Sequence, residues 1–427
     1  MKIINFYKIE NLYKLGKFSF YAGLFLLPSA FFISAILFLI ALSIGFFVNK
    51  KGYFEDSLNK FFFLGALMLI ISSTVNSIFP LLIKGGSISK IFSENVSLFN
   101  WIPIIFGFHG FQPYLNSKNS RKNCGILIIL ASLPVIYSVV GQAFFEWHGP
   151  MQTLGGLIVW YQRPIEGITS VTGLFNNQNY LGSWLCLIWP FSLALFLEKE
   201  KSNLKHFLFF LFLISIALLI VLTASRAAWL SLLLSIPIIF GRRGTKLFII
   251  LISAIFIIFL LIFIPIFGEG FQNQIMNILP EGIWSNFLPA TYEMNISRIK
   301  IWEVALDTIK KYPIFGSGSS FPNILEAKTG FWRGHTHNLP LEIMVSYGIP
   351  ASLFILTPIT KLVIKSYEEV FINKNSFFRE NLFDRAWITS LILLAFSHFV
   401  DIQYFDGRIS IAGWVLLAGS SQIIKKN

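Results

Sequence analysis

The feature of this sequence that most constrains its fold is a series of long apolar runs, each close to the length that crosses a membrane. A spanning helix needs roughly 20 mostly apolar residues, because the hydrocarbon layer of a bilayer is about 30 Å thick. Of the 427 residues, 55% are hydrophobic and only 13% are charged, whereas soluble domains are about one quarter charged. The runs therefore predict an all-α integral membrane protein with about 12 transmembrane helices, and they exclude a soluble enzyme and a disordered chain.

The predicted spans divide these runs at proline or at charged residues. The first run, 18–49, contains Pro28 and is predicted to hold two short spans, since proline breaks a helix. The remaining spans are predicted at 61–83, 99–115, 124–145, 180–197, 206–223, 227–241, 247–267, 339–363, 386–402 and 409–423. No separable second domain is apparent, so residues 1–427 are predicted to form a single polytopic domain.

The charge distribution predicts how the chain is oriented. The net charge is +13, but the basic residues lie in short clusters between apolar runs, such as Lys50-Lys51 and Arg242-Arg243. This arrangement is typical of cytoplasmic loops and not of a nucleic-acid-binding stripe. We therefore expect a multi-pass protein of the bacterial inner (plasma) membrane with both termini in the cytoplasm and with no nucleic-acid partner.

Two long segments, 146–179 and 268–338, are predicted to lie outside the cytoplasm. Long ordered loops often carry function, so the working surface is expected on this periplasmic side. Within the larger loop, 295–311 has helical periodicity and is predicted to form an amphipathic helix at the membrane interface, ended by Tyr312-Pro313 and followed by a flexible turn at 316–320. Its apolar face is predicted to comprise Ile296, Ile299, Trp302, Leu306 and Ile309.

Polar residues at this outer side form a chemically coherent set. Arginine binds phosphate oxygens through a planar, permanently charged fork, which suits Arg226, between two apolar runs, and Arg298, on the amphipathic helix. His335 and His337 lie where the large loop enters a span, and a neutral histidine there suits general-base work. Glu342 would orient the imidazole or assist the acceptor. Alternatively, each arginine is simply an interfacial or solvated side chain.

A metal site is not expected from the sequence. The His335-x-His337 pair resembles part of a metal site, but no nearby Cys or Asp completes a ligand set. The two cysteines, Cys124 and Cys186, lie in or beside apolar runs and are interpreted as small packing residues. We therefore expect no metal and no other cofactor.

Four segments give the chain a resemblance to the O-antigen ligase and polymerase superfamily of bacterial membrane proteins, over roughly residues 165–360. Any one of them is a weak match, but their order and their placement around the large loop are specific. Ala227 departs from the family pattern, where glycine is common. The segments are TGLFNNQNYL (172–181), TASRAAW (223–229), RIKIW with PIFGSG (298–302 and 313–318), and HTHN with LE and GI (335–338, 341–342 and 348–349).

This resemblance implies a GT-C-like helical fold and a metal-independent glycosyltransferase. The donor would be a glycan on undecaprenyl diphosphate, and the acceptor a hydroxyl of lipid A core, of another glycan or of a protein, as in lipopolysaccharide biosynthesis. By motif, Arg226 and Arg298 would bind the diphosphate and His337 would activate the acceptor. Glu342 would be a second catalytic residue, and the supporting residues would be His335, Asn338 and Arg333.

Other functions remain open at this stage. The sequence does not identify the acceptor. Three activities, O-antigen ligase, O-antigen polymerase and protein glycosyltransferase, therefore remain as alternatives. Some members of the same superfamily are regarded as inorganic-carbon transporters, and a basic outer pocket would also attract bicarbonate. A transporter or flippase usually shows inverted repeats or charges along its spans, whereas here His398 and Asp401 are the main ionisable pair within a predicted span and have a structural interpretation as well.

Overall fold

The structure is a computed structural model that describes residues 2–49, 51–84, 95–160, 162–164, 170–198, 202–264, 268–278, 297–373 and 381–425. It is helical apart from one short antiparallel pair of strands, β1 (Met151–Thr153) and β2 (Ile158–Trp160). The helices are α1 (Lys2–Leu26), α2 (Phe31–Val48), α3 (Ser57–Lys84), α5 (Ile102–Gly110), α6 (Lys118–Ala131), α7 (Leu133–Phe145), α8 (Gln178–Leu197), α9 (Asn203–Leu222), α10 (Arg226–Phe240), α11 (Arg242–Phe263), α12 (Glu269–Ile278), α15 (Arg298–Lys311), α16 (Phe321–Thr329), α17 (Leu339–Tyr367), α18 (Leu382–Val400) and α19 (Gly407–Ile424).

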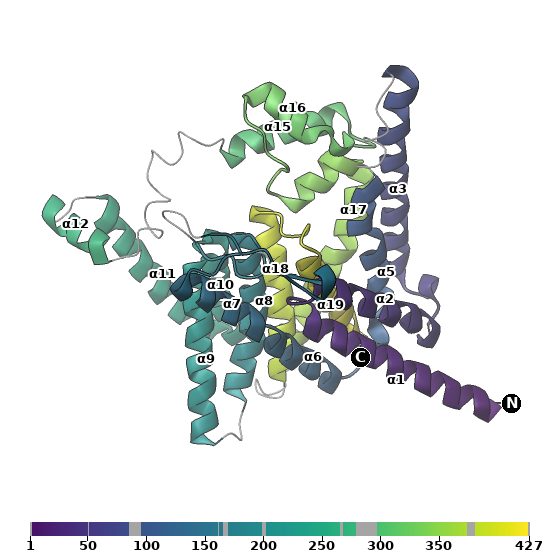
Figure 1. The fold of residues 1–427 in the computed structure, drawn as a ribbon, viewed down its shortest axis with the longest axis horizontal. Helices are drawn as coiled ribbons and strands as arrows, with labels where there is room; N and C mark the ends of the chain where they lie inside the picture. Colours follow the sequence, from purple (N-terminus) through teal and green to yellow (C-terminus); the bar gives the residue numbers. More distant parts are fainter. Residues whose placement is uncertain are drawn as a thin grey trace.

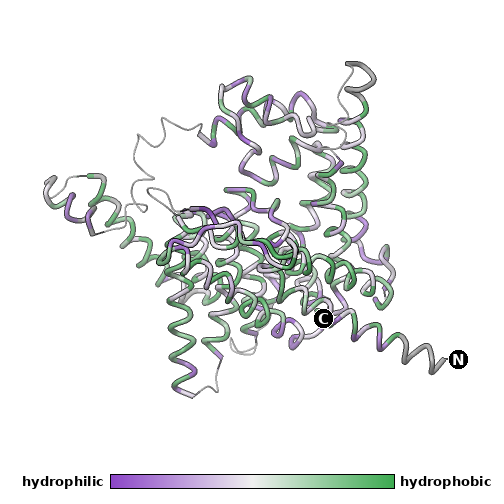
Figure 2. Tube along the Cα trace, in the orientation of Figure 1, coloured by the Kyte–Doolittle hydropathy of each residue, from purple (hydrophilic) through white to green (hydrophobic). Residues whose placement is uncertain are grey.

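Eight helices in the described ranges are long and apolar enough to cross a membrane, and Figure 2 shows their apolar stretches in green. Four of the twelve predicted spans are not among these eight, and one of them is the first span of the 18–49 run, which lies in α1. The prediction at 99–115 corresponds to α5, which has 9 residues and so spans only about 14 Å at 1.5 Å per residue. The prediction at 227–241 corresponds to α10, with 15 residues, and α19 is not among the eight. The predicted helical fold with several membrane-spanning candidates is confirmed, and the exact count stays a prediction.

The break predicted in the first apolar run is confirmed. α1 ends at Leu26 and α2 begins at Phe31, with Pro28 in the turn between them. The two helices pack closely, because Gly23 leaves room for the Phe38 ring and its carbonyl accepts a hydrogen bond from Ser34 Oγ at 2.8 Å.

The bundle has two distinct ends, which we call the site end and the basic end. At the site end α8, α10, α17 and α19 begin and α9 and α18 finish. Contacts join these termini directly: Val171 N donates to Leu222 O at 3.2 Å, and Arg408 Nη1 donates to Leu174 O at 2.7 Å. The segments predicted to lie outside the cytoplasm thus meet at one end of the bundle.

The basic end is tied together by charges from loops that are distant in sequence. Arg121 on α6 forms a bidentate ion pair with Asp384 on α18, with Nε–Oδ1 2.8 Å and Nη2–Oδ2 3.0 Å, and both side chains are buried. Lys118 Nζ donates to Asn381 Oδ1 at 2.8 Å. These residues come from two loops that are both predicted to lie inside, and the structure places them at the same end of the bundle, while the compartment at each end stays a prediction.

Helices α15 and α16 form a small layer above the site end (Figure 1). Their shared core with the first turns of α17 includes Ile301, Val304, Phe321, Leu325 and Val345, all buried. The amphipathic helix is therefore present, and its predicted face is right for Trp302 and Ile309, which pack here, but wrong for Ile299 and Leu306.

The buried stripe of α15 runs through Ile301, Val304, Ala305 and Ile309. Ile299 and Leu306, predicted to be on the packed face, are 68% and 50% exposed. The error arose because two apolar stripes fit the same helical period, and the packing against α16 and α17 selects one of them. Ile296 and residues 279–296 of the predicted outer loop lie outside the described residues.

The turn after α15 is tightly packed. The prediction of a flexible turn at 316–320 is therefore wrong. Gly316 has φ 65°, and a Cβ there would lie 2.5 Å from the carbonyl carbon of Ser346. Gly348 interrupts α17 with φ 89° and ψ 167°, a conformation essentially restricted to glycine. A Cβ there would lie 2.0 Å from the Ile314 carbonyl oxygen. The two glycine-containing segments thus lie backbone against backbone, which fixes the layer of α15 and α16 on α17.

Candidate functional site

The segment 335–338 enters α17 at the site end, and its backbone is held from three directions. Asn338 caps α17 by accepting the Leu341 amide at 3.0 Å, and its side-chain amide donates to Phe399 O on α18 at 2.9 Å. Trp302 Nε1 on α15 donates to Thr336 O at 3.0 Å. The histidines on either side of Thr336 are therefore fixed by three different helices.

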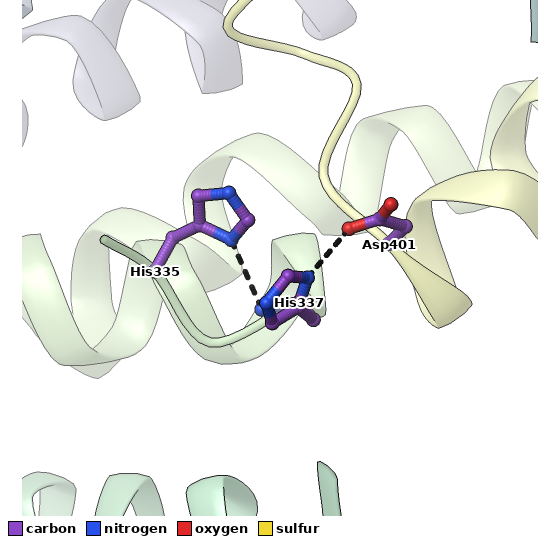
Figure 3. Close-up of side chains that lie close together, drawn as sticks. All are labelled: His335, His337 and Asp401. Atoms are coloured by element: carbon purple, nitrogen blue, oxygen red, sulfur yellow. Dashed lines mark hydrogen bonds and ion pairs between the residues drawn. The ribbon is translucent and has the colours of Figure 1, made fainter. Parts of the chain in front are cut away.

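His337 is paired with a carboxylate from the end of α18. Its Nδ1 lies 2.7 Å from Asp401 Oδ1 (Figure 3), and 25% of the His337 side chain is exposed, against 6% for Asp401. Because an ionised carboxylate only accepts hydrogen bonds, the proton of a neutral His337 lies on Nδ1. The Nε2 lone pair is then free to accept a proton from a bound hydroxyl.

Asp401 is itself held in place. Asn179 Nδ2 on α8 donates to its Oδ2 at 2.7 Å, and its Oδ1 accepts the Ile402 amide at 2.9 Å. Burial alone raises the pKa of Asp401, but the hydrogen bond from His337 and the charge of that residue outweigh it, so that the pKa lies below its usual value. The carboxylate therefore stays charged beside the imidazole and orients it.

His335 lies beside His337 in a T-shaped ring contact, with centroids 4.4 Å apart and planes at 68°. Its Nδ1 accepts the His337 backbone amide at 3.4 Å. Burial, followed by the charge of His337, lowers the pKa of His335 to about 4, so the ring is neutral near pH 7. The two histidines thus differ, since within the described residues a hydrogen bond to a carboxylate is found for His337 and not for His335.

Arg298 begins α15 with an exposed side chain at the edge of this group. Its positive charge contributes to lowering the pKa of both His335 and Asp401, which locates the guanidinium near the two. A cation here also attracts anionic ligands toward His337.

Arg226 is the first residue of α10 at the same end of the bundle, and its side chain is exposed. α10 lies against α8 near Gly182, where a Cβ would be 3.2 Å from Ser225 Cβ, and Gly182 is one turn beyond Asn179. Of the four helices that begin here, α8, α17 and α19 have side-chain caps from Asn177, Asn338 and Asp406, whereas Ser225 provides none to α10. The positive end of the α10 helix dipole therefore lies at Arg226, where it favours an anion.

The other predicted residues have less direct positions. Glu342 is buried, and its two oxygens accept hydrogen bonds from the Thr336 amide at 2.8 Å and from Ser346 Oγ at 3.3 Å. It therefore braces the backbone between the two histidines. Arg333 is partly exposed and donates from Nη1 to the carbonyl of the adjacent Trp332 at 3.1 Å.

An apolar cavity of about 250 Å³ lies directly below the site, between α17, α18 and α19. Leu339 and Pro340, which follow Asn338 in the chain, line it together with Phe399. Its other walls include Ile355, Ile359, Leu391, Leu394, Ala395, Tyr404, Gly413 and Trp414. The cavity thus offers apolar space immediately beneath the polar group around His337.

Two residues of the candidate site, Asp401 and Asn179, were not connected with it from the sequence. Asp401 was noted as an ionisable residue near the outer end of a span but not connected with His337, from which it is 64 positions away in the chain. Asn179 was part of the TGLFNNQNYL motif without an assigned role. The sequence does place a carboxylate and an amide at the same end of two apolar helices. It does not show that these two helices are neighbours in the bundle, which is what brings Asn179 to Asp401.

Comparison with known protein families identifies one part of the chain. Residues 207–356 match the family model described as O-antigen ligase. No curated protein matches the chain. The matched segment contains Arg226, Arg298 and the 335–338 loop, but not Asn179 or Asp401.

Proposed function

With residues 207–356 in the O-antigen ligase superfamily, we propose that this membrane protein is a glycosyltransferase that moves a glycan from undecaprenyl diphosphate to a hydroxyl acceptor at the site end. The observation that carries the proposal is the 2.7 Å contact between His337 Nδ1 and Asp401 Oδ1, which leaves Nε2 available as a base. By the orientation inferred from loop charge, the site end faces the periplasm.

The proposed reaction needs a base and a cation on opposite sides of the bond that breaks. His337 Nε2 takes the acceptor proton as the acceptor oxygen forms a bond to the anomeric carbon of the donor glycan. The bond between that carbon and the diphosphate oxygen breaks, and the electron pair leaves with undecaprenyl diphosphate. Asp401 stabilises the imidazolium that forms.

The leaving group is a diphosphate, so positive charge at the site end supports the proposal. Arg226 and Arg298 would bind its oxygens, and the positive end of the α10 helix dipole at Arg226 would add to the attraction. Arginines can neutralise the developing charge without a metal ion, so we propose a metal-independent transfer. His335, Asn338, Arg333 and Glu342 would support this group, with Glu342 acting by holding the backbone of Thr336.

The apolar cavity supports a lipid-linked donor. An engineered apolar cavity of about 150 Å³ in another protein binds benzene, so 250 Å³ would hold the first units of an isoprenoid chain whose diphosphate lies among the polar residues above. Ala395→Phe would reduce this space and should raise the donor KM. Leu353→Phe is the matched control, because Leu353 on α17 is 59% exposed and does not line the cavity.

The acceptor would be lipid A core, another glycan or a protein, and the same base serves each of them. The test is the rate at which the reconstituted full chain consumes a polyprenyl-diphosphate-linked glycan in the presence of each acceptor class. His337→Ala should abolish consumption while donor binding persists. The control is His206→Ala, because His206 is exposed on α9 near the basic end. Normal consumption by the His337 variant would refute the proposal.

A further inference from the structure

Three side chains at the site form a group that could hold a metal ion, although no complete ligand set was expected from the sequence. His335, His337 and Asp401 each present one ligand atom, and these atoms all lie within 4.8 Å of one another. Figure 3 shows the three side chains close together, with His337 joined by hydrogen bonds to both of the others. The fold thus supplies the Asp that was lacking near the His335-x-His337 pair.

The ligands are already held by surrounding groups. Asn179 and the Ile402 amide orient the Asp401 carboxylate, and the Glu342 carboxylate holds the Thr336 backbone between the histidines. Such outer contacts orient the ligands of metal sites and contribute strongly to affinity. A cation would therefore meet a largely formed site.

The ligand types select the class of cation. Two imidazoles and one carboxylate suit Zn²⁺ and similar transition metals and leave a coordination position open, whereas Mg²⁺ and Ca²⁺ prefer oxygen ligands. Bonds of about 2.0–2.1 Å in a tetrahedron require ligand atoms about 3.4 Å apart. Atoms that now lie within 4.8 Å would approach this spacing by rotation of the side chains.

We propose that His335, His337 and Asp401 bind Zn²⁺ or a similar transition-metal cation, and that this cation inhibits glycan transfer by competing for His337. The inhibitory part rests on the proposed function. A metal on Nε2 would occupy the lone pair that takes the acceptor proton. A metal on Nδ1 would displace the hydrogen bond to Asp401. Either arrangement removes the base, so binding and transfer exclude each other.

Binding can be measured without activity by using Co²⁺ as a spectroscopic probe. The purified full chain, freed of metal with a chelator, should gain visible d–d absorption of low-symmetry four-coordinate Co²⁺, saturating near one equivalent, and added Zn²⁺ should abolish it. His335→Asn and Asp401→Asn should lose this absorption, whereas His206→Ala and the exposed Asp307→Asn should retain it. Absence of the signal in the native chain, or equal signals in all variants, would overturn the proposal.

A second measurement guards against variants that fold poorly. Zn²⁺ should raise the melting temperature of the native chain and of the two control variants, and it should not raise that of the monodisperse fraction of His335→Asn. Mg²⁺ at the same concentration should leave all of them unchanged. Equal stabilisation of the His335 variant by Zn²⁺ would place the metal elsewhere and overturn the assignment.

Activity then separates this inference from the proposed function. Donor consumption by the metal-free chain should fall at least tenfold when Zn²⁺ saturates the Co²⁺-monitored site, and a chelator should restore it. Transfer that persists with the site saturated overturns the inhibitory role and leaves the proposed function standing. A chain that binds Co²⁺ at these residues but never consumes donor supports the metal site and contradicts the proposed function. Donor consumption that requires Zn²⁺ would overturn the proposal that the metal competes with transfer for His337.

Discussion

Replacing Asp401 by Asn removes the negative charge beside His337 with almost no change in volume. The native carboxylate accepts from Nδ1 at 2.7 Å and keeps the Nε2 lone pair free. Asp401 Oδ1 also accepts the Ile402 amide, so the amide oxygen of the variant would keep this position and still accept from Nδ1. The imidazolium formed during transfer then loses its counter-charge.

The size of the effect follows from this one contact. Hydrogen bonds to charged groups contribute about 1.5–3 kcal/mol, and about 1.4 kcal/mol corresponds to a tenfold change in rate. Asp401→Asn should therefore lower kcat by at least about tenfold and by up to about 150-fold. Donor KM should change little, because only 6% of the Asp401 side chain is exposed. The residue is also not proposed to contact the donor.

The assay is consumption of a polyprenyl-diphosphate-linked glycan by reconstituted protein, which reports turnover whatever the acceptor. Asp307→Asn is the matched control, because Asp307 on α15 is exposed and its ion pair with Lys328 lies on the surface. A kcat within twofold of the native value for Asp401→Asn would refute the role of the carboxylate. A raised KM with normal kcat would instead assign Asp401 to donor binding.

Three further perturbations test other parts of the account. Arg298→Lys keeps the charge but loses the bidentate fork, so donor KM should rise about tenfold in the same assay. Gly348→Ala should reduce the monodisperse fraction in detergent chromatography, because its Cβ would lie 2.0 Å from Ile314 O; a native profile would contradict the tight packing. Asp384→Asn leaves Arg121 buried without its ionic partner, which costs about 3–5 kcal/mol of folding stability. The melting temperature should therefore fall markedly, and an unchanged melting temperature would show that the ion pair contributes little.

The sequence predicted the class of fold because membrane helices carry a local signal. Apolar runs located α8, α9 and α18 to within a few residues, and the break at Pro28 was also correct. The predicted count of twelve was less secure, because length and hydropathy are marginal for elements such as α5. Periodicity likewise detected α15 but not which of its two apolar stripes packs, since that depends on α16 and α17.

The site was only partly accessible from sequence for a similar reason. Arg298, His335 and His337 lie on contiguous motifs around the large loop and were identified together. Asp401 and Asn179 come from the ends of α18 and α8, and their meeting depends on the order of helices around the bundle. The role of Glu342 was also hard to anticipate, since its contact with the Thr336 amide depends on the turn of the backbone between the two histidines.

The central claim is that His337 activates the acceptor of a glycan transfer at the outer face. It is tested most directly by a surface-glycan gel from cells lacking this protein, complemented with the native chain, with His337→Ala or with His206→Ala. We predict that the deletion strain and the strain with His337→Ala lose long surface glycan and accumulate lipid-linked glycan. If the acceptor is another glycan, these two strains keep only single repeat units. The native chain and His206→Ala should restore the normal glycan. Unchanged glycans in the deletion strain, together with reduced bicarbonate uptake, would contradict the account and favour transport.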